Sequence, residues 1–248
     1  MVELKSGPEV EKIRKSAAIV ARVLKKLKEA GQPGVTTARL DETARSILKN
    51  EGARAAFLGY RGFPAAACVS INHEVVHGIP SEKRKLKQGD IVSVDFGVEL
   101  NGYYGDAALT FGVGKVSDTA RRLMEVTESA LHCGIKMAVP GKRLGDISAA
   151  VQVHVEERGF AVVRDFVGHG IGRQLHEDPM VPNFGKPGTG PELRPGMVLA
   201  IEPMVNEKGH EVIVKDDEWT VETKDKGLSA HFEHDVAITE NGPDILSK

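Results

Sequence analysis

The chain has 248 residues, of which 41 % are hydrophobic and 27 % are charged, and its formal net charge is −2 at pH 7. This length allows one large domain or two small ones with a sizeable core, and the balanced charge excludes the strongly basic surface that is typical of DNA-binding proteins. The first residues lack the apolar core of a secretion signal, and no stretch reaches the roughly 20 apolar residues of a membrane helix. We therefore expect a cytoplasmic protein that binds neither DNA nor membranes.

Two helices are predicted at the start of the chain. Ser6 and Glu9 match a capping box, and apolar residues then recur at helical spacing until Gly31. A second helical pattern covers residues 40–48. Short runs rich in valine, isoleucine and aromatic residues follow, which predicts strands after the two helices.

The chain contains only two cysteines, Cys68 and Cys133. Two are too few for a disulfide framework in a chain of this length, and their spacing is not that of a zinc finger, which agrees with a reducing compartment. We expect Cys133 to be a small buried hydrophobic residue.

A basic stretch follows the first predicted strands. Its residues, Lys83, Arg84, Lys85 and Lys87, could contact an acidic partner such as ribosomal RNA. A solvated loop is the favoured interpretation, because runs of like charge are usually exposed to water.

Two aspartates are expected on one face of a hairpin. Asn101 and Gly102 favour a two-residue type I′ turn, and the resulting register places Gly97 opposite Asp106, with Asp95 diagonal to Asp106. The residues that alternate with these acids are apolar and form the opposite face. Two carboxylates this close repel each other unless a cation stands between them.

A long repeat connects the second half of the chain with the first. The segment LKQGDIVSVDFGV, which begins at Leu86, returns as LRPGMVLAIEPMV at Leu193, and the shift of 107 residues carries Asp95 onto Glu202. Two copies of so long a unit suggest duplication around a pseudo-two-fold axis, because solenoid repeats are much shorter. Acids from both copies could then serve one divalent metal site at that axis.

The repeat also predicts the fold. Shifting the first two helices places helices at about 118–138 and 145–158. The expected class is α+β, with a mainly antiparallel sheet and flanking helices. We expect a single catalytic domain over residues 1–248, with pseudo-symmetric halves at about 8–112 and 115–240.

The second half offers three further candidate ligands. Glu202 and Glu233 each interrupt an apolar strand pattern, and His169 stands between two glycines that would let the ring approach a ligand. A lone histidine of this kind is usually structural, but it gains weight beside four acids. Because bridging carboxylates commonly hold two ions, the five residues predict a dinuclear centre of manganese, iron, cobalt or zinc. Such a pair activates water and polarises a carbonyl, which points to hydrolysis of an amide or ester.

The residues in this order resemble the methionine aminopeptidase family of the creatinase and prolidase superfamily, whose fold is called pita-bread. The matching segments cover nearly the whole chain: NHEVVHGIP (72–80), SVDFGVELNGYYGDAALTF (93–111), GHGIG (168–172), LHEDP (175–179), IEPM (201–204) and HFEHDVAI (231–238). The resemblance implies two divalent ions per chain, of Co, Mn, Fe, Zn or Ni. It implies that one ion is bound by Asp95, Asp106 and Glu233, and the other by Asp106, His169, Glu202 and Glu233.

The resemblance also implies roles in binding the substrate. His176 would lie near the scissile carbonyl and His77 near the peptide nitrogen beyond it, and Glu202 is the candidate acid or base for water. An imidazole donor near the oxygen would stabilise the tetrahedral intermediate. Five residues match positions that line or cover the family's pocket for the methionine side chain: Tyr60, Phe63, Cys68, Leu175 and Trp219. Phe63 stands where tyrosine is common and Leu175 where phenylalanine is common, which puts the shape of this pocket in question.

The leading hypothesis is therefore a metal-dependent exopeptidase that removes the initiator methionine from new polypeptides when the second residue is small. A monomer is expected from the family. The separation of 31 residues between Glu202 and Glu233 leaves no room for the helical insertion of the second type, so type I fits. An Xaa-Pro peptidase of the same superfamily is the enzyme alternative, although those relatives usually carry a large domain before the catalytic one. A peptide-binding or ribosome-associated relative without catalysis is the other alternative.

Overall fold

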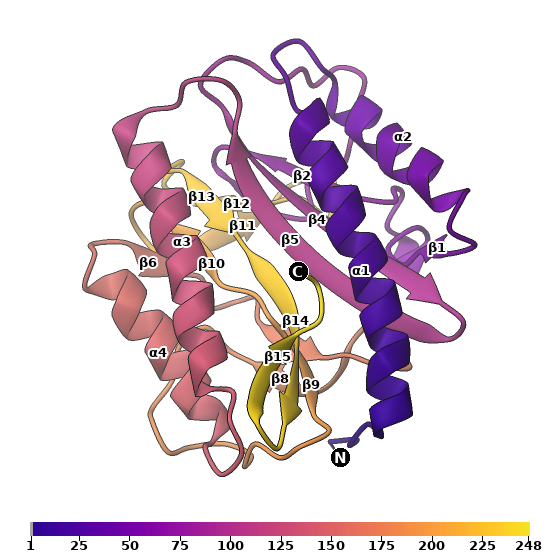
Figure 1. Ribbon diagram of the computed structural model, residues 1–248. Helices are drawn as coiled ribbons and strands as arrows, with labels where there is room; N and C mark the ends of the chain where they lie inside the picture. Colours follow the sequence, from indigo (N-terminus) through magenta and orange to yellow (C-terminus); the bar gives the residue numbers. More distant parts are fainter. Residues whose placement is uncertain (1) are drawn as a thin grey trace.

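The computed structural model describes residues 2–248, and within them the chain forms four α-helices (Figure 1). They are α1 (Gly7–Ala30), α2 (Thr37–Leu48), α3 (Asp118–Met137) and α4 (Leu144–Glu156). All four helices predicted from the sequence are confirmed. The capping box is confirmed as well, because the Ser6 backbone N–H donates to Glu9 Oε2 over 2.9 Å. The predicted end of the first helix is also confirmed, since α1 ends directly before Gly31. Helix α2 begins three residues before the predicted start because the Thr36 hydroxyl accepts a hydrogen bond from the Arg39 backbone N–H.

The strands form one large sheet and two small ones. In residues 2–248 they are β1 (Arg54–Ala55), β2 (Cys68–Ile71), β3 (Glu74–Val76), β4 (Ile91–Leu100), β5 (Tyr103–Gly112), β6 (Ala161–Val162), β7 (Gly168–Gly170), β8 (Glu177–Val181), β9 (Val198–Ile201), β10 (Met204–Asn206), β11 (Val212–Val214), β12 (Val221–Thr223), β13 (Ser229–His231), β14 (Glu233–Thr239) and β15 (Gly242–Ile245). A short 3₁₀ turn, η1, spans Tyr60–Gly62.

The large sheet has the order β1-β4-β5-β14-β9-β7-β8, with β2 also paired to β4 and β15 to β14. The small sheets have the orders β13-β10-β6 and β11-β12-β3. Neighbouring strands pair in the antiparallel sense, as in β4–β5, β5–β14 and β14–β9. The predicted α+β class with antiparallel pairing is therefore confirmed.

The β4–β5 hairpin has the register predicted from its turn, with Gly97 opposite Asp106. Two glycines show what each face of the hairpin packs against. A Cβ on Gly105 would lie 2.4 Å from the backbone nitrogen of Ala17 in α1, whereas a Cβ on Gly97 would lie 2.7 Å from the ring of Phe57. One face of the hairpin is therefore covered by α1, and the face that carries Asp95 and Asp106 points away from this helix.

The helix-covered face of the hairpin forms a continuous apolar core. Figure 1 shows α1 crossing in front of β4 and β5, and α3 lying beside α4 in front of the other half. Buried residues of α1, α2, β4 and β5 form the largest cluster, among them Val20, Leu27, Leu40, Val94 and Phe96. Burying a side chain such as that of Phe96 contributes about 2–3 kcal/mol to folding. This core fixes the strands from one side and leaves the other side available for polar groups.

Local geometry recurs at the shift of 107 residues seen in the sequence. The Gly34 N–H donates to the Leu86 carbonyl over 2.8 Å, and the Gly141 N–H donates to the Leu193 carbonyl over 3.1 Å. Gly34 and Gly141 have left-handed φ angles of 91° and 83°, which favour glycine. The two halves differ in one connection along the chain. The first half turns directly at Asn101 between β4 and β5, whereas in the second half β11 and β12 are inserted between β10 and β13.

The structure corrects the expectation for Cys133. Cys68 is buried, but Cys133 lies half-buried on α3 with its Sγ atom 3.3 Å from Nδ1 of His154 on α4. The sequence prediction was wrong because a single cysteine in a helix does not reveal which neighbour the adjoining helix brings to it.

The basic stretch is mainly the solvated loop that was predicted. Lys83, Lys85 and Lys87 are exposed, whereas the half-buried Arg84 pairs with Glu74 and donates to the Ile79 carbonyl. None of the helices in residues 2–248 is both long and apolar enough to cross a membrane.

Candidate metal and substrate site

The residues predicted for metal and substrate binding line one cavity of about 150 Å³. Its lining contains all twelve of them: Tyr60, Phe63, Cys68, His77, Asp95, Asp106, His169, Leu175, His176, Glu202, Trp219 and Glu233. A larger groove of about 710 Å³ lies against α1 and α3, but its lining brings no histidine cluster together with the acids. The chemistry of the lining, rather than volume, therefore identifies the smaller cavity as the candidate site.

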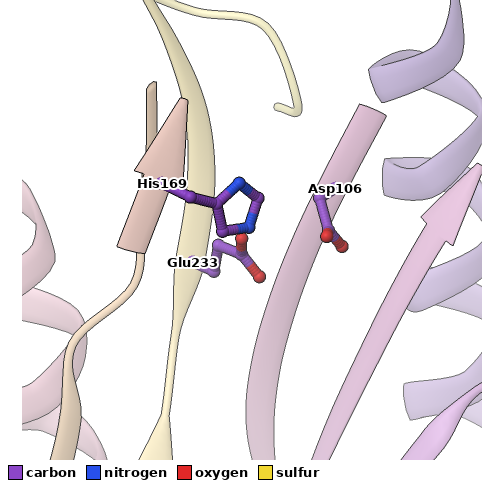
Figure 2. A group of neighbouring side chains, drawn as sticks. All are labelled: Asp106, His169 and Glu233. Atoms are coloured by element: carbon purple, nitrogen blue, oxygen red, sulfur yellow. The ribbon is translucent and has the colours of Figure 1, made fainter. Parts of the chain in front are cut away.

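The sheet order brings the polar residues of this cavity together. Asp106 lies on β5, Glu233 on β14 and His169 on β7, and β14 and β9 separate β5 from β7 in the sheet. Figure 2 shows the His169 ring and the Glu233 carboxylate facing the Asp106 carboxylate from separate strands. One ligand atom from each of the three lies within 4.8 Å of the others. Asp95 on β4 and Glu202 directly after β9 line the same cavity.

The orientation of His169 suits a ligand role. Its Nδ1 lies 2.8 Å from the Gly170 carbonyl oxygen, so Nδ1 carries the proton and Nε2 keeps a free lone pair. Nε2 lies 3.6 Å from Oε1 of Glu202. This tautomer is the one that a metal-binding histidine uses.

The glycines beside His169 allow tight packing of the neighbouring strands. A Cβ on Gly168 would lie 2.3 Å from the Ala200 carbonyl oxygen, and a Cβ on Gly170 would lie 2.3 Å from the Asp178 carbonyl oxygen. Both glycines therefore permit close approach of neighbouring backbone, which holds His169 in place between β8 and β9.

Burial away from water strongly raises the pKa values of the acids in the cavity. Burial raises the pKa of Asp95 to about 7 and that of Glu202 to about 7. The pKa values of Asp106 and Glu233 lie well above their usual range, first because of burial and second because of the neighbouring acids. Without a compensating cation, these carboxyl groups cannot all be ionised at neutral pH.

Buried carboxylate oxygens without hydrogen-bond partners indicate whether a cation would fit this cluster. Oδ1 of Asp95, Oδ1 of Asp106 and Oε1 of Glu233 are buried and have no hydrogen-bond partner. Such groups are costly unless something else satisfies them. A divalent cation would neutralise the acids and accept these oxygens as ligands, so the residues present fit a metal.

His176 and Tyr60 lie at the edge of the acid cluster. Nδ1 of His176 is 2.9 Å from the Tyr60 hydroxyl oxygen, and the two rings stack with centroids 5.2 Å apart. The ring centroids of His169 and His176 are 4.2 Å apart. Loss of solvation, reinforced by the neighbouring His169, lowers the pKa of His176 to about 3, so the ring is neutral at physiological pH.

The opposite wall of the cavity is apolar and aromatic. The rings of Phe63 and Trp219 meet edge to face at a centroid distance of 5.2 Å, and the Trp219 and His77 ring centroids are 6.3 Å apart. His77 has a left-handed φ of 59°, a strained conformation for a residue other than glycine. Burial lowers its pKa to about 4 and raises the pKa of the Cys68 thiol. The wall therefore offers apolar contact beside a neutral imidazole.

Several residues in or beside this cavity were not predicted from the sequence. Phe57 and Arg61 also line it. His231 is 1 % exposed, both of its ring nitrogens are without a hydrogen-bond partner, and its Nε2 lies 3.6 Å from Glu202 Oε2. Asp235 is fully buried and accepts a hydrogen bond from the Asp106 backbone N–H over 2.8 Å. Alternation in HFEHDVAI was the available signal, because His231 and Asp235 are each two residues from Glu233.

The site combines a carboxylate cluster that fits a divalent cation with an imidazole and an apolar wall. Together with the curved antiparallel sheet that carries it, this site defines a metal-dependent hydrolase of the pita-bread fold. The sequence model of metallopeptidase family M24 matches residues 11–240, and the chain belongs to this family.

Comparison with individual proteins agrees with this assignment. A methionine aminopeptidase of Clostridium acetobutylicum is 52 % identical over 247 residues, which cover 100 % of this chain and 99 % of the relative. The crystal structure of a methionine aminopeptidase from Thermotoga maritima is 49 % identical, covers 100 % of both chains and has a TM-score of 0.99. A prolidase from Pyrococcus furiosus shares the fold at 24 % identity, with a TM-score of 0.80 over 99 % of this chain and 65 % of the prolidase.

Proposed function

We propose that this chain is a type I methionine aminopeptidase, which hydrolyses the bond after an N-terminal methionine when the second residue is small. The observation that carries the proposal is the meeting of five candidate metal ligands and an apolar pocket in a single cavity. Relatives about 50 % identical over the full length, such as that of Bacillus subtilis, are methionine aminopeptidases.

We infer that two divalent ions bind to the cluster. Asp95, Asp106 and Glu233 would hold one ion, and Asp106, His169, Glu202 and Glu233 the other. The acids and the single imidazole suit Co, Mn, Fe, Zn or Ni. When bound, such ions supply Lewis-acid activation of water and of the scissile carbonyl. Glu202, with a pKa near 7 in the unloaded cluster, is the residue that would accept and return the proton.

The apolar wall would bind the methionine side chain. Phe63, Cys68, Leu175 and Trp219, with Tyr60 at the edge, offer aromatic and sulfur neighbours that suit a flexible thioether. A cavity of about 150 Å³ is comparable to one that accommodates benzene in an engineered protein. This size favours one side chain and excludes a longer peptide from the pocket itself.

Two neutral histidines would act on the reacting bond. If the Tyr60 hydroxyl donates to Nδ1 of His176, the proton of this ring is on Nε2, which can donate to the developing oxyanion. His77 would lie near the leaving nitrogen and manage its proton. Their low pKa values keep both rings neutral, so they neither add charge to the cluster nor compete with a cation.

The biological setting is also part of the proposal. The substrates would be the N-terminal methionines of nascent polypeptides in the cytoplasm. The exposed Lys83, Lys85 and Lys87 could support a transient contact with the ribosome. We further propose a monomer in which residues 1–248 form a single catalytic domain, with halves near 8–112 and 115–240.

A peptide panel tests this function. Peptides that start with Met-Gly, Met-Ala or Met-Leu are incubated with protein loaded separately with each candidate metal, and released methionine is measured. We expect cleavage before glycine and alanine, little before leucine, and none with a chelator. Faster hydrolysis of an Xaa-Pro dipeptide would instead indicate a prolidase-like activity. Tight peptide binding without any turnover, combined with failure to bind metal, would indicate a non-catalytic relative.

A further inference from the structure

A second cluster of reactive side chains lies on the outer surface, between α3 and α4. Cys133 Sγ is 3.3 Å from Nδ1 of His154, and Nε2 of His154 is 2.6 Å from the Ser129 hydroxyl oxygen. Ser129 and Cys133 are one turn apart on α3, and His154 faces them from α4. The thiol is therefore part of a thiol, imidazole and hydroxyl series held by two packed helices.

One hydrogen-bond arrangement presents a lone pair to the thiol. The Ser129 hydroxyl lies 3.0 Å from the Val126 carbonyl oxygen, to which it can donate its proton. In this arrangement the Ser129 oxygen accepts from Nε2–H of His154, and the lone pair of the neutral ring is on Nδ1, facing the Cys133 S–H. Partial burial, followed by the charge of Arg158, lowers the pKa of His154, so the ring is neutral at physiological pH.

The thiol and the imidazole lie in a groove whose lining favours reactants of negative charge. Cys133 and His154 line a groove of about 570 Å³ together with three cationic side chains, Lys136, Lys142 and Arg158. Of the two acids in the lining, Asp146 is already engaged by the backbone N–H groups of Arg143 and Gly188. The exposed Val153 adds an apolar floor. A small reactant with carboxylate groups would fit this lining better than a cationic one.

We propose that Cys133 is a modification site for thiol–disulfide exchange with small, carboxylate-bearing disulfides, with His154 as the base and Ser129 holding the ring. Nδ1 of His154 takes the S–H proton, and the sulfur of Cys133 attacks one sulfur of the disulfide. The S–S bond of the reactant breaks, a mixed disulfide forms on Cys133, and the departing thiolate takes the proton from His154. Cys133 is oxidised and half of the reactant is reduced to a thiol.

The other cysteine gives an internal reference. Cys68 is only 4 % exposed. It should therefore stay unmodified in the folded protein, because a disulfide reactant has no access to its sulfur. The inference does not depend on the proposed function, since the helices that carry the series pack outside the large sheet (Figure 1).

The test uses the full chain and oxidised glutathione as the probe. Intact mass and peptide mapping measure the rate and the position of the adduct in wild type, His154→Gln, Ser129→Ala and the control His132→Gln. His132 adjoins Cys133 but is exposed. We expect one adduct at Cys133, a rate about 10²-fold lower in His154→Gln as for loss of a general base, a smaller loss in Ser129→Ala, and no change in His132→Gln. Circular dichroism melting confirms that each variant is folded.

The charge preference is tested first on the wild type and then on a charge-reduced variant. Oxidised glutathione should react faster than cystamine, a cationic disulfide, once both rates are divided by those with a free cysteine peptide. Replacing Lys136 and Lys142 together by glutamine should reduce this preference. An unchanged rate in His154→Gln, equal labelling of Cys68, faster reaction with cystamine, or no adduct with oxidised glutathione would each overturn the proposal.

Discussion

Replacing Asp106 by asparagine should change stability and activity in opposite directions. Asp106 is 3 % exposed, lies among other acids, and its pKa is well above the ordinary 3.8. In the absence of metal, the folded protein therefore retains a proton that the unfolded chain releases above pH 3.8. The contribution of Asp106 to the stability of the wild type consequently falls as the pH rises, because at this group the folded state binds more protons than the unfolded state. Asparagine has the same shape, does not ionise and can donate to the neighbouring carboxyl oxygens.

The size of this effect follows from linkage. Holding one carboxyl protonated at pH 7, when its unfolded pKa is 3.8, costs up to about 4 kcal/mol at about 1.4 kcal/mol per pH unit. We expect metal-free Asp106→Asn to be more stable than metal-free wild type by an amount below this ceiling, since the other acids also relax. Changes at the histidines cancel in the comparison, because both proteins contain them.

Metal should shift the difference in stability towards the wild type. A cation that binds only the folded wild type adds about 2.7 kcal/mol at one hundred times its Kd, whereas the variant lacks the carboxylate that we propose both ions share and should lose turnover as well. Urea unfolding at pH 6, 7 and 8, with a chelator and then with manganese, measures both effects. The exposed Asp216→Asn is the matched control, with an expected change within about 0.5 kcal/mol. If metal-free Asp106→Asn proved less stable than the wild type at every pH, the account of a strained acid cluster would be wrong.

Three further changes test separate parts of the structure. His176→Ala should retain metal, measured by elemental analysis, but lose about 10²-fold in kcat, as for loss of an oxyanion donor; full activity would contradict its role. Tyr60→Phe removes the hydroxyl 2.9 Å from His176 and should lower kcat by a smaller factor than His176→Ala, whereas a change in KM alone would indicate a role only in the pocket. Gly105→Ala would place a Cβ 2.4 Å from the α1 backbone and should destabilise the protein by about 1–3 kcal/mol or more, as measured by thermal unfolding. The control Gly7→Ala, with open space around the new Cβ, should not destabilise it. Equal melting temperatures of the two variants would refute the close packing.

Much of the local structure was predictable because it depends on neighbouring residues in the chain. Ser6 and Glu9 define the start of α1, and the Asn101 turn sets the β4–β5 register, so Asp95 and Asp106 were placed on one face correctly. The acids of the second half were recognisable because an ionisable residue in an apolar strand requires compensation. The repeat showed that related units occur twice, which located helices α3 and α4.

Contacts between distant segments were decided only by the tertiary structure. The order β5-β14-β9-β7 brings Asp106, Glu233 and His169 within 4.8 Å of one another, and no local rule in the sequence specifies that order. The same reason explains why Cys133 was expected to be buried: its partner, His154, lies on another helix. Patterning along the chain determines which face of an element is polar, whereas packing between elements determines which polar groups meet and how strongly their pKa values shift.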